Sequence, residues 1–294
     1  MRRLLVAATL ALGSAAVQAG SLPPRGCDRP PDATATQQDR LLRFTAAIKA
    51  VLAASGTEAA LIARSGTDLS RLRLRYSHAA IALADGLDTP WAVRQLYYAC
   101  DEGAPRLFDQ GLAGFISGSD DVDVGYVSVL LLPPDAAATL AAATRDKAVA
   151  LGLLHPQYSA NAYAFGTRYQ NCNQWVAELL AAAFAGTATR ADAQAWLRRE
   201  GYAPEPVRVP PLLMLAGRFV PWVHFDDHPA ELLSANAVQT SLPDGLEAFA
   251  LKRWPTARRI EFCHGPQGVL SRGDGRPLAA GCVAQAGDQV TALD

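Results

Sequence analysis

Two residues of this chain have the chemistry of a nucleophile and its base. Cys172 lies in the stretch Asn171-Cys172-Asn173-Gln174, which has the pattern of a helix start: Asn171 is a good N-cap, and Gln174 has the position that completes a capping box. The first turn of a helix leaves backbone N–H groups unpaired, and these groups and the helix dipole stabilise an anion. Because the thiolate is the reactive form of cysteine, this position favours a lowered thiol pKa.

A nucleophilic cysteine needs a base close by, and His78 suits that role best. His155 precedes a proline at an expected helix end, and His264 adjoins a cysteine expected in a disulfide. His224 and His228 bracket a loop-like segment, where they either bind a cation or stabilise the loop. His78 instead starts an apolar run, where an unpaired imidazole costs free energy. Alternatively, Cys172 is only a small buried hydrophobic residue, and His78 is only a core residue with a hydrogen-bond partner.

Apolar periodicity indicates the elements that would position this pair. The expected helices cover residues 36–55, 135–153, 171–184 and 191–200, and the expected strands cover 59–63, 77–84, 91–98 and 122–132. The second and third of these strands flank a turn-forming segment and are expected to pair as an antiparallel hairpin. This order of helix, strands, helix and cysteine-bearing helix predicts an α+β fold.

The chain divides into three expected regions, at residues 1–19, 20–201 and 202–294. The second region contains the pair and is expected to be the main domain. The third is rich in proline, with possible strands at 259–263 and 268–271. It is either a small β-rich appendage or an extension wrapped on the main core.

The first region has the layout of a secretory signal peptide. Arg2 and Arg3 precede an uncharged apolar run, and small residues precede the expected cleavage after Ala19. The run is short for a stable membrane anchor, although an uncleaved anchor is the alternative, and no other stretch is long and apolar enough to cross a membrane. We therefore expect a periplasmic or secreted protein without a transmembrane anchor after cleavage.

The composition excludes one class of partner. The chain has 27 basic and 28 acidic side chains, for a net charge of −1. A nucleic-acid-binding protein needs a basic face, so no nucleic acid is expected as a partner. His224 and His228 are too sparse for a metal site, and no metal or organic cofactor is expected.

The five cysteines predict disulfides, because an exported chain meets an oxidising compartment. Cys263 and Cys282 lie at the two ends of a Gly- and Pro-rich segment and are expected to form a local bridge. Cys27 and Cys100 would then tie the mature N-terminus to the first sheet, which leaves Cys172 free. This is the preferred one of the three pairings that four cysteines allow.

The motifs around both candidate residues resemble those of a known superfamily. Ser77-His78-Ala79-Ala80-Ile81 is similar to the Ser-His-x-Gly-Ile strand of the circularly permuted NlpC/P60-like proteins, which are relatives of papain and of lecithin:retinol acyltransferase. The helix start from Asn171 to Val176 resembles their Asn-Cys-x-x-Phe-Val helix, and histidine precedes cysteine as in the permuted group. Short segments that begin at Trp91, Phe108 and His224 resemble an uncharacterised family of exported proteobacterial proteins. That likeness covers most of the mature chain.

The resemblance implies a papain-like fold, in which an antiparallel sheet packs on the cysteine-bearing helix and residues 202–294 form a C-terminal extension. It implies Cys172 as nucleophile and His78 as base. The third position, usually His, Glu, Asp or Asn, matches Gln95, which can orient the imidazole but cannot stabilise imidazolium by charge; the alternative is a polar residue on a sheet face. The hydroxyl of Tyr169 or the backbone N–H of Cys172 is the expected oxyanion donor.

The expected function is therefore a cysteine hydrolase or acyltransferase acting on an amide or ester bond. Among relatives the substrates range from cell-wall peptides to lipid acyl groups, and peptidoglycan peptide is available in the periplasm. The alternative is a non-catalytic binding or assembly module that retains the fold, which the uncharged Gln95 favours. A redox role for Cys172 would need a resolving cysteine, which the expected pairings do not leave.

Overall fold

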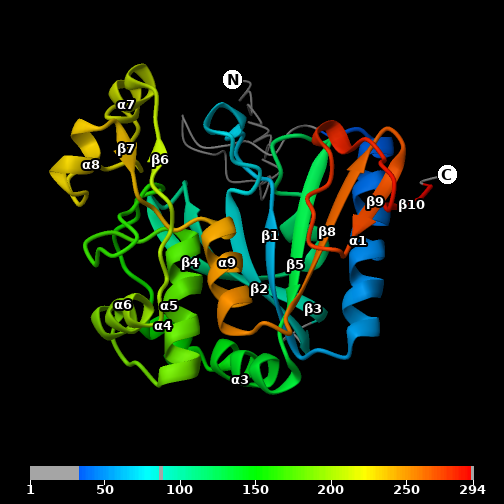
Figure 1. Ribbon diagram of the computed structural model, residues 1–294, viewed down its shortest axis with the longest axis horizontal. Coiled ribbons are helices and arrows are strands. Elements are labelled where there is room, and N and C mark those ends of the chain that lie inside the picture. The colour runs from blue at the N-terminus through cyan, green and yellow to red at the C-terminus, as the bar shows by residue number, and fades with distance from the viewer. Residues whose placement is uncertain (1–32, 86–88, 293–294) are drawn as a thin grey trace, which may run out of the picture.

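Short apolar runs ended by turn residues form the strands of the structure, a computed structural model that describes residues 33–85 and 89–292. In these residues the main sheet has eight strands in the order β10-β9-β8-β5-β1-β2-β3-β4, and every neighbouring pair is antiparallel (Figure 1). Its strands are β1 (Ala59–Arg64), β2 (His78–Asp85), β3 (Pro90–Ala99), β4 (Ala104–Gly111), β5 (Gly125–Leu131), β8 (Arg258–Gly265), β9 (Gly268–Arg272) and β10 (Gln289–Thr291). The short strands β6 (Val207–Arg208) and β7 (Ala237–Val238) form a separate ribbon.

Helices cover both faces of the main sheet. They are α1 (Ala35–Ser55), α2 (Leu112–Ile116), α3 (Pro134–Arg145), α4 (Lys147–Gly152), α5 (Cys172–Ala185), α6 (Arg190–Arg199), α7 (Pro211–Gly217), α8 (Ala230–Ser234) and α9 (Pro243–Arg253). One core cluster joins α1 and α2 to the sheet, and a second joins α3, α5 and α9 to its opposite face. The expected α+β class with a large antiparallel sheet is confirmed, and the sheet packs on the cysteine-bearing helix α5.

The two covered faces explain why β1 is apolar throughout. Ala59, Leu61 and Ala63 lie in the core toward α5, whereas Ala60 and Ile62 lie in the core toward α1. A strand buried on both faces needs apolar residues at successive positions, so it does not alternate with polar ones. The run at 59–63 therefore marks the centre of the sheet.

Local sequence signals predicted helices α1, α5 and α6 and the central hairpin. Helix α1 ends at Gly56, which has the left-handed φ of 67° that glycine adopts readily. Strands β2 and β3 pair antiparallel, as expected. The single helix expected at 135–153 is wrong: α3 and α4 are separated at Asp146, whose carboxylate caps α4 by accepting from the backbone N–H of Ala148.

The C-terminal region contributes strands to the main sheet. Strand β8 pairs with β5, and β9 and β10 continue the sheet beyond it. Residues 258–291 therefore extend the central sheet and do not form a separate β-rich appendage. Helices α7 and α8 and the β6–β7 ribbon lie at one end of the molecule (upper left of Figure 1).

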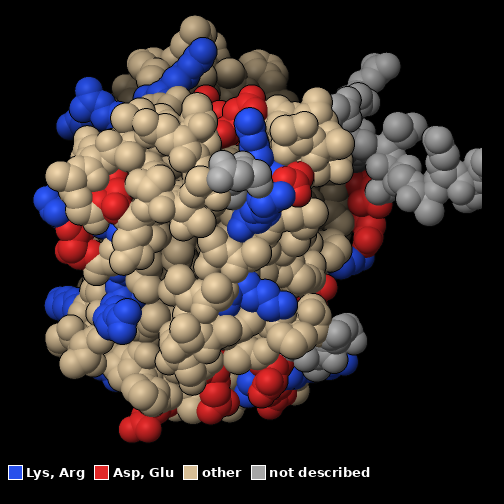
Figure 2. All heavy atoms as spheres, turned by 90° about the vertical axis from the view of Figure 1, so that its right-hand side faces the viewer, with Lys and Arg blue, Asp and Glu red and all other residues tan. Residues whose placement is uncertain are grey.

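Charges of both signs intermingle on the face drawn in Figure 2, between large areas of uncharged surface. This distribution agrees with the nearly equal numbers of basic and acidic side chains. Among the described residues, no helix has the length and apolar character needed to span a membrane.

Candidate functional site

A cavity at one end of the sheet contains both residues singled out by their chemistry. It has a volume of about 390 Å³ and lies where β1 and β3 end and β2 begins. Cys172, His78 and Asn173 contribute to its wall, together with Arg64, Ser77, Leu96, Tyr97, Tyr98, Tyr158 and Trp222. This volume falls within the range of about 300–1,000 Å³ that is usual for small-molecule sites.

Cys172 is the first residue of α5, as its sequence context predicts. The Asn171 side chain caps the helix by accepting from the Gln174 backbone N–H at 2.7 Å. The Asn173 backbone N–H, the charge of Arg64 and the Tyr158 hydroxyl each favour the thiolate. Burial outweighs these effects and raises the pKa of the Cys172 thiol to about 11. The backbone at the helix start does lower this pKa, as expected, but burial has the larger effect.

His78 is the first residue of β2 and is held by Gln95 on the neighbouring strand. Its Nε2 lies 2.6 Å from Gln95 Oε1. The amide oxygen can only accept, so Nε2 carries the proton and Nδ1 is the basic nitrogen. Burial, aided by the charge of Arg64, lowers the pKa of His78 to about 3, and the ring is neutral near pH 7. Gln95 thus has the orienting contact expected of it, without supplying charge.

The thiol and the imidazole line the same cavity but approach it from opposite faces of the sheet. Period-two alternation places His78 with Ala80 and Ala82, which pack toward α1 and α2, and its ring lies 5.8 Å from that of Phe115. Cys172 belongs to the core on the α5 face. Among the hydrogen bonds of the described residues, His78 bonds to Gln95, and none joins His78 to Cys172.

Asn173 fastens the start of α5 to the start of β2. Its Oδ1 accepts from the Ala79 backbone N–H at 2.8 Å, and its Nδ2 donates to the carbonyl oxygens of Ser77 and Ser241 at 3.1 and 3.0 Å. These bonds fix the position of Cys172 relative to the strand that bears His78. The sequence analysis missed this role, although a buried polar residue directly after the cysteine is a signal that could have shown it.

Arg64 is the second contributor that sequence reasoning missed. It lies directly opposite His78 in the antiparallel β1–β2 pair, so the two side chains share a face. It is only 5% exposed, yet it lines the cavity. The signal in the sequence was a charged residue that closes an otherwise apolar strand.

Tyr169 does not contact the thiol. Its ring stacks on His224 with centroids 4.5 Å apart, its hydroxyl donates to Asp226 at 3.4 Å, and it is not part of the cavity wall. The expectation that Tyr169 donates to an oxyanion is corrected accordingly. Position in the chain suggested it, but the loop before α5 turns its side chain away, and Tyr158 from the same loop approaches Cys172 instead.

Aromatic side chains form one wall of the cavity. The ring of Tyr98 stacks on that of Tyr158, with centroids 5.1 Å apart, and lies 5.9 Å from that of Trp222. The backbone N–H of Ala160 donates to the Trp222 carbonyl at 2.8 Å, which joins the loops that bear these rings. This wall offers a flat apolar surface beside the thiol.

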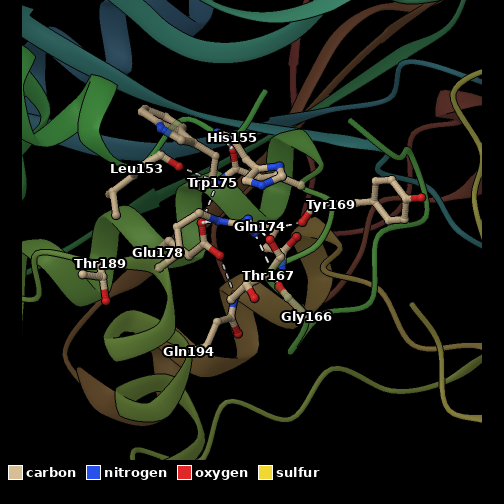
Figure 3. A network of polar contacts seen from close by, with 12 residues as sticks. Leu153, His155, Gly166, Thr167, Tyr169, Gln174, Trp175, Glu178, Thr189 and Gln194 are labelled. Atoms are coloured by element: carbon tan, nitrogen blue, oxygen red, sulfur yellow. Dashed lines mark hydrogen bonds and ion pairs between the residues drawn. The ribbon is translucent and has the colours of Figure 1, made fainter. Parts of the chain in front are cut away.

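A buried polar network supports the loop that precedes Cys172 (Figure 3). Glu178 on α5 is fully buried and accepts from Arg190 at 2.8 Å and from Gln194 at 2.6 Å. Arg190 also donates to the carbonyl oxygens of Thr167 and Tyr169 at 2.8 and 2.9 Å. Burial raises the pKa of Glu178 and the adjacent guanidinium opposes that rise. The network connects α5 and α6 to the loop at 166–170.

Gln174 also holds this loop, and this corrects the expected capping box. Its Nε2 donates to the carbonyl oxygens of Tyr163 and Gly166 at 3.1 and 2.8 Å. The side chain therefore points into the loop and does not return to the helix start.

Cys263 and Cys282 form a disulfide with an S–S distance of 2.01 Å, and Cys172 is a free thiol. Cys100 is also disulfide-bonded. Cys27 lies outside the described residues, so its pairing with Cys100 stays a prediction.

His224 and His228 stabilise loops. His224 stacks on Tyr169, and His228 Nε2 donates to the carbonyl oxygen of Asn161 at 2.7 Å. Within residues 33–85 and 89–292, no three His, Cys, Asp or Glu side chains are grouped as metal ligands would be.

The fold and the cavity define an α+β protein with a cysteine, a histidine and a glutamine at the end of a large antiparallel sheet. A model of the family described as "Uncharacterized protein conserved in bacteria (DUF2145)" matches residues 51–250, and the chain belongs to this family. No curated protein and no solved structure matches the chain. Membership of an uncharacterised bacterial family agrees with the sequence analysis, whereas the relationship to NlpC/P60-like proteins stays a prediction.

Proposed function

We propose that this protein is an exported cysteine hydrolase or acyltransferase of the papain-like, NlpC/P60-like type, acting on an amide or ester bond. Cys172 is the nucleophile, His78 the base, and Gln95 the residue that orients His78. The observation that carries the proposal is that one cavity is lined by a free thiol at a helix N-terminus and by an imidazole whose tautomer is fixed.

The charge states favour a general-base mechanism, because thiol and imidazole are both neutral near pH 7. His78 Nδ1 takes the thiol proton as the sulfur attacks the carbonyl carbon, and the carbonyl oxygen becomes an oxyanion. The backbone N–H of Cys172, at the start of α5, is the proposed donor to this oxyanion. His78 then returns the proton to the leaving nitrogen or oxygen as the C–N or C–O bond breaks. Water, or another acceptor, releases the acyl group from Cys172.

This mechanism requires a rearrangement on substrate binding. No hydrogen bond joins the thiol and the imidazole among the described residues, and catalytic hydrogen bonds often form only in the substrate complex. Both residues line one cavity, so a substrate that fills it contacts both.

The cysteines and the N-terminal sequence support the proposed export. The Cys263–Cys282 disulfide suits an oxidising compartment. The signal-peptide pattern at residues 1–19 lies outside the described residues and supports export from sequence alone. A periplasmic or secreted enzyme meets cell-wall peptides and lipid acyl groups, and these are the proposed substrate classes.

The second candidate is a non-catalytic binding or assembly module. The uncharged Gln95 favours it, and so does the lack, among the described residues, of a hydrogen bond between His78 and Cys172. In this case the cavity binds its ligand without turnover, and Cys172→Ala leaves ligand binding unchanged.

A panel of p-nitrophenyl esters, thioesters and cell-wall peptides tests the proposal. If the protein is an enzyme, we expect turnover that is lost in Cys172→Ala and in His78→Ala. Turnover should be retained in His155→Ala, because His155 lies outside the cavity. Turnover that persists in Cys172→Ala would refute the mechanism. Binding of one of these compounds without turnover in the wild type would support the second candidate.

A further inference from the structure

Three aromatic rings line the cavity beside Cys172 and His78, and the proposed mechanism does not use them. They belong to Tyr98 on β3, Tyr158 in the loop before α5, and Trp222 in the segment after α7, and we call them the aromatic wall. The ring centroids of Tyr158 and Trp222 lie 5.1 and 5.9 Å from that of Tyr98. Both distances are within the range of about 4.5–7 Å at which aromatic rings attract one another, so the three rings form one continuous surface.

Backbone contacts hold the aromatic wall in place without a ligand. Tyr98 lies in the paired part of β3, and Tyr158 forms a β-bridge with Gln170. The backbone N–H of Ala160 donates to the carbonyl oxygen of Trp222 at 2.8 Å. Three segments far apart in the chain thus present their rings in a preformed arrangement, and a preformed site loses little conformational entropy when a ligand binds.

The aromatic wall begins at the reacting atom. The hydroxyl of Tyr158 hydrogen-bonds with the sulfur of Cys172, so only this hydroxyl separates the ring from the thiol. A group attached to the carbonyl carbon that the sulfur attacks is therefore within reach of the wall. Apolar side chains continue the lining of the cavity, and they are Leu96, Val223 and Leu242.

The rings of the aromatic wall are not fully covered by the protein. Tyr98, Tyr158 and Trp222 each keep part of their surface exposed, although all three line the cavity. A ligand that covers apolar surface of this kind gains free energy from its burial. An aromatic ring gains more than an aliphatic group of the same size, because its face and its edge also attract neighbouring rings.

We infer that the aromatic wall selects acyl compounds that carry an aromatic ring next to the reacting carbonyl group. This inference rests on the proposed function and names the substrate class of the Cys172 site. Tyr98 and Trp222 are the specificity-determining residues, because they contact the ring of the ligand and not the reacting atoms.

Two alkylating reagents of similar size test the inference. Phenacyl bromide has a flat phenyl ring on its carbonyl group, and bromomethyl cyclohexyl ketone has a puckered aliphatic ring at the same place. With each, the sulfur forms a bond to the CH₂ carbon, the C–Br bond breaks, bromide leaves with the electron pair, and the buffer takes the thiol proton. Mass spectrometry on the oxidised full chain gives the phenyl-to-cyclohexyl rate ratio at Cys172, with a free cysteine peptide as reference. We expect a ratio about threefold to tenfold above that of the peptide.

Matched variants show whether the aromatic wall causes this preference. Trp222→Ala and Tyr98→Leu each remove one ring and should lower the ratio by about threefold, whereas Trp222→Phe keeps a ring and should retain most of it. Phe219→Ala is the control, because Phe219 is an exposed aromatic residue in the same segment as Trp222 but outside the cavity. It should leave the ratio unchanged.

Three results would overturn the inference. One is a ratio in folded Trp222→Ala and Tyr98→Leu equal to that of the wild type. Another is a wild-type ratio no higher than that of the peptide, which decides the matter even if these variants do not fold. The third is no reaction of phenacyl bromide at Cys172 where the peptide reacts. Alkylation requires neither the base His78 nor the release of an acyl group, so a failure of this inference and a failure of the proposed enzyme are distinguishable.

Discussion

His78 donates its Nε2–H to Gln95 Oε1 across the β2–β3 pair, over a distance of 2.6 Å. A glutamine acceptor fixes the tautomer without adding charge, so the ring keeps a basic Nδ1 and a pKa lowered to about 3 by burial. Burial keeps the ring neutral, whereas the hydrogen bond to Gln95 raises its pKa, so the proposed mechanism uses His78 as a neutral base.

Gln95→Glu is expected to raise the pKa of His78 above its value of about 3, because a carboxylate stabilises imidazolium. The measurement is the pH titration of the His78 Cε1–H signal by NMR. Gln95→Leu is the control: it removes the acceptor, lowers the free energy of unfolding by about 1–3 kcal/mol, and brings no charge. An unchanged titration in Gln95→Glu would show that the 2.6 Å contact does not control the ring.

Asn173→Ala is expected to loosen the start of α5. It removes the hydrogen bonds to Ala79, Ser77 and Ser241, and we expect a loss of about 2–4 kcal/mol in the free energy of unfolding. The thiol of Cys172 should also react faster with a neutral alkylating reagent, because it becomes more accessible. Gln38→Ala, on the exposed side of α1, is the control. Unchanged stability and reactivity would show that Asn173 does not hold the start of α5 against the start of β2.

Glu178→Ala is expected to lower the free energy of unfolding by about 3–5 kcal/mol, because it leaves the Arg190 guanidinium buried without its carboxylate. The double variant Glu178→Met, Arg190→Met should lose less, since it leaves no buried charge. Glu200→Ala, which breaks an exposed pair with Arg253, should cost at most about 1 kcal/mol. Chemical denaturation gives all three values, and equal losses in Glu178→Ala and Glu200→Ala would contradict the role of the network.

Stability is expected to fall on acidification. Burial lowers the pKa of His78 to about 3 and that of His264 to about 4, both below the ordinary value of 6.5. The unfolded chain therefore binds protons that the folded chain excludes as the pH falls below 6.5, and the free energy of unfolding decreases from there toward pH 3–4. Above pH 6.5 these two groups have no effect. The measurement is the urea midpoint between pH 7 and pH 4.

His264→Phe provides the matched control for this pH dependence. His264 packs on Phe44, so an apolar ring can replace it. In this variant the free energy of unfolding should depend less steeply on pH, because only the contribution of His78 remains. A slope identical to the wild type would show that the buried His264 does not contribute.

The sequence predicted the elements that carry strong local signals. The apolar run of β1, the β2–β3 hairpin and the Asn171 cap all depend on residues close together in the chain, and the structure has each of them. The contact between Gln95 and His78 also followed from a motif, since neighbouring strands bring such positions together. Strand β4 was missed because it is an edge strand with several exposed polar residues and little apolar alternation.

What the sequence did not show depends on packing between distant segments. Pairing of β8 with β5 joins residues far apart in the chain, and no local pattern selects that partner. The pKa of Cys172 depends on how deeply α5 is buried, which a cap cannot indicate. The relation of His78 to Cys172 depends on which face of β2 packs on α5, and Arg64 becomes part of the cavity only through its register with His78.

The most direct test of the central claim is the rate at which p-nitrophenyl acetate acylates Cys172 in the wild type and in His78→Ala. Release of nitrophenolate gives the rate, and peptide mapping gives the modified residue. If Cys172 is the nucleophile and His78 its base, the acetyl group is found on Cys172, and the rate falls by about 10²-fold or more in His78→Ala. Equal rates in the two proteins, or no acetyl group on Cys172, would contradict the account.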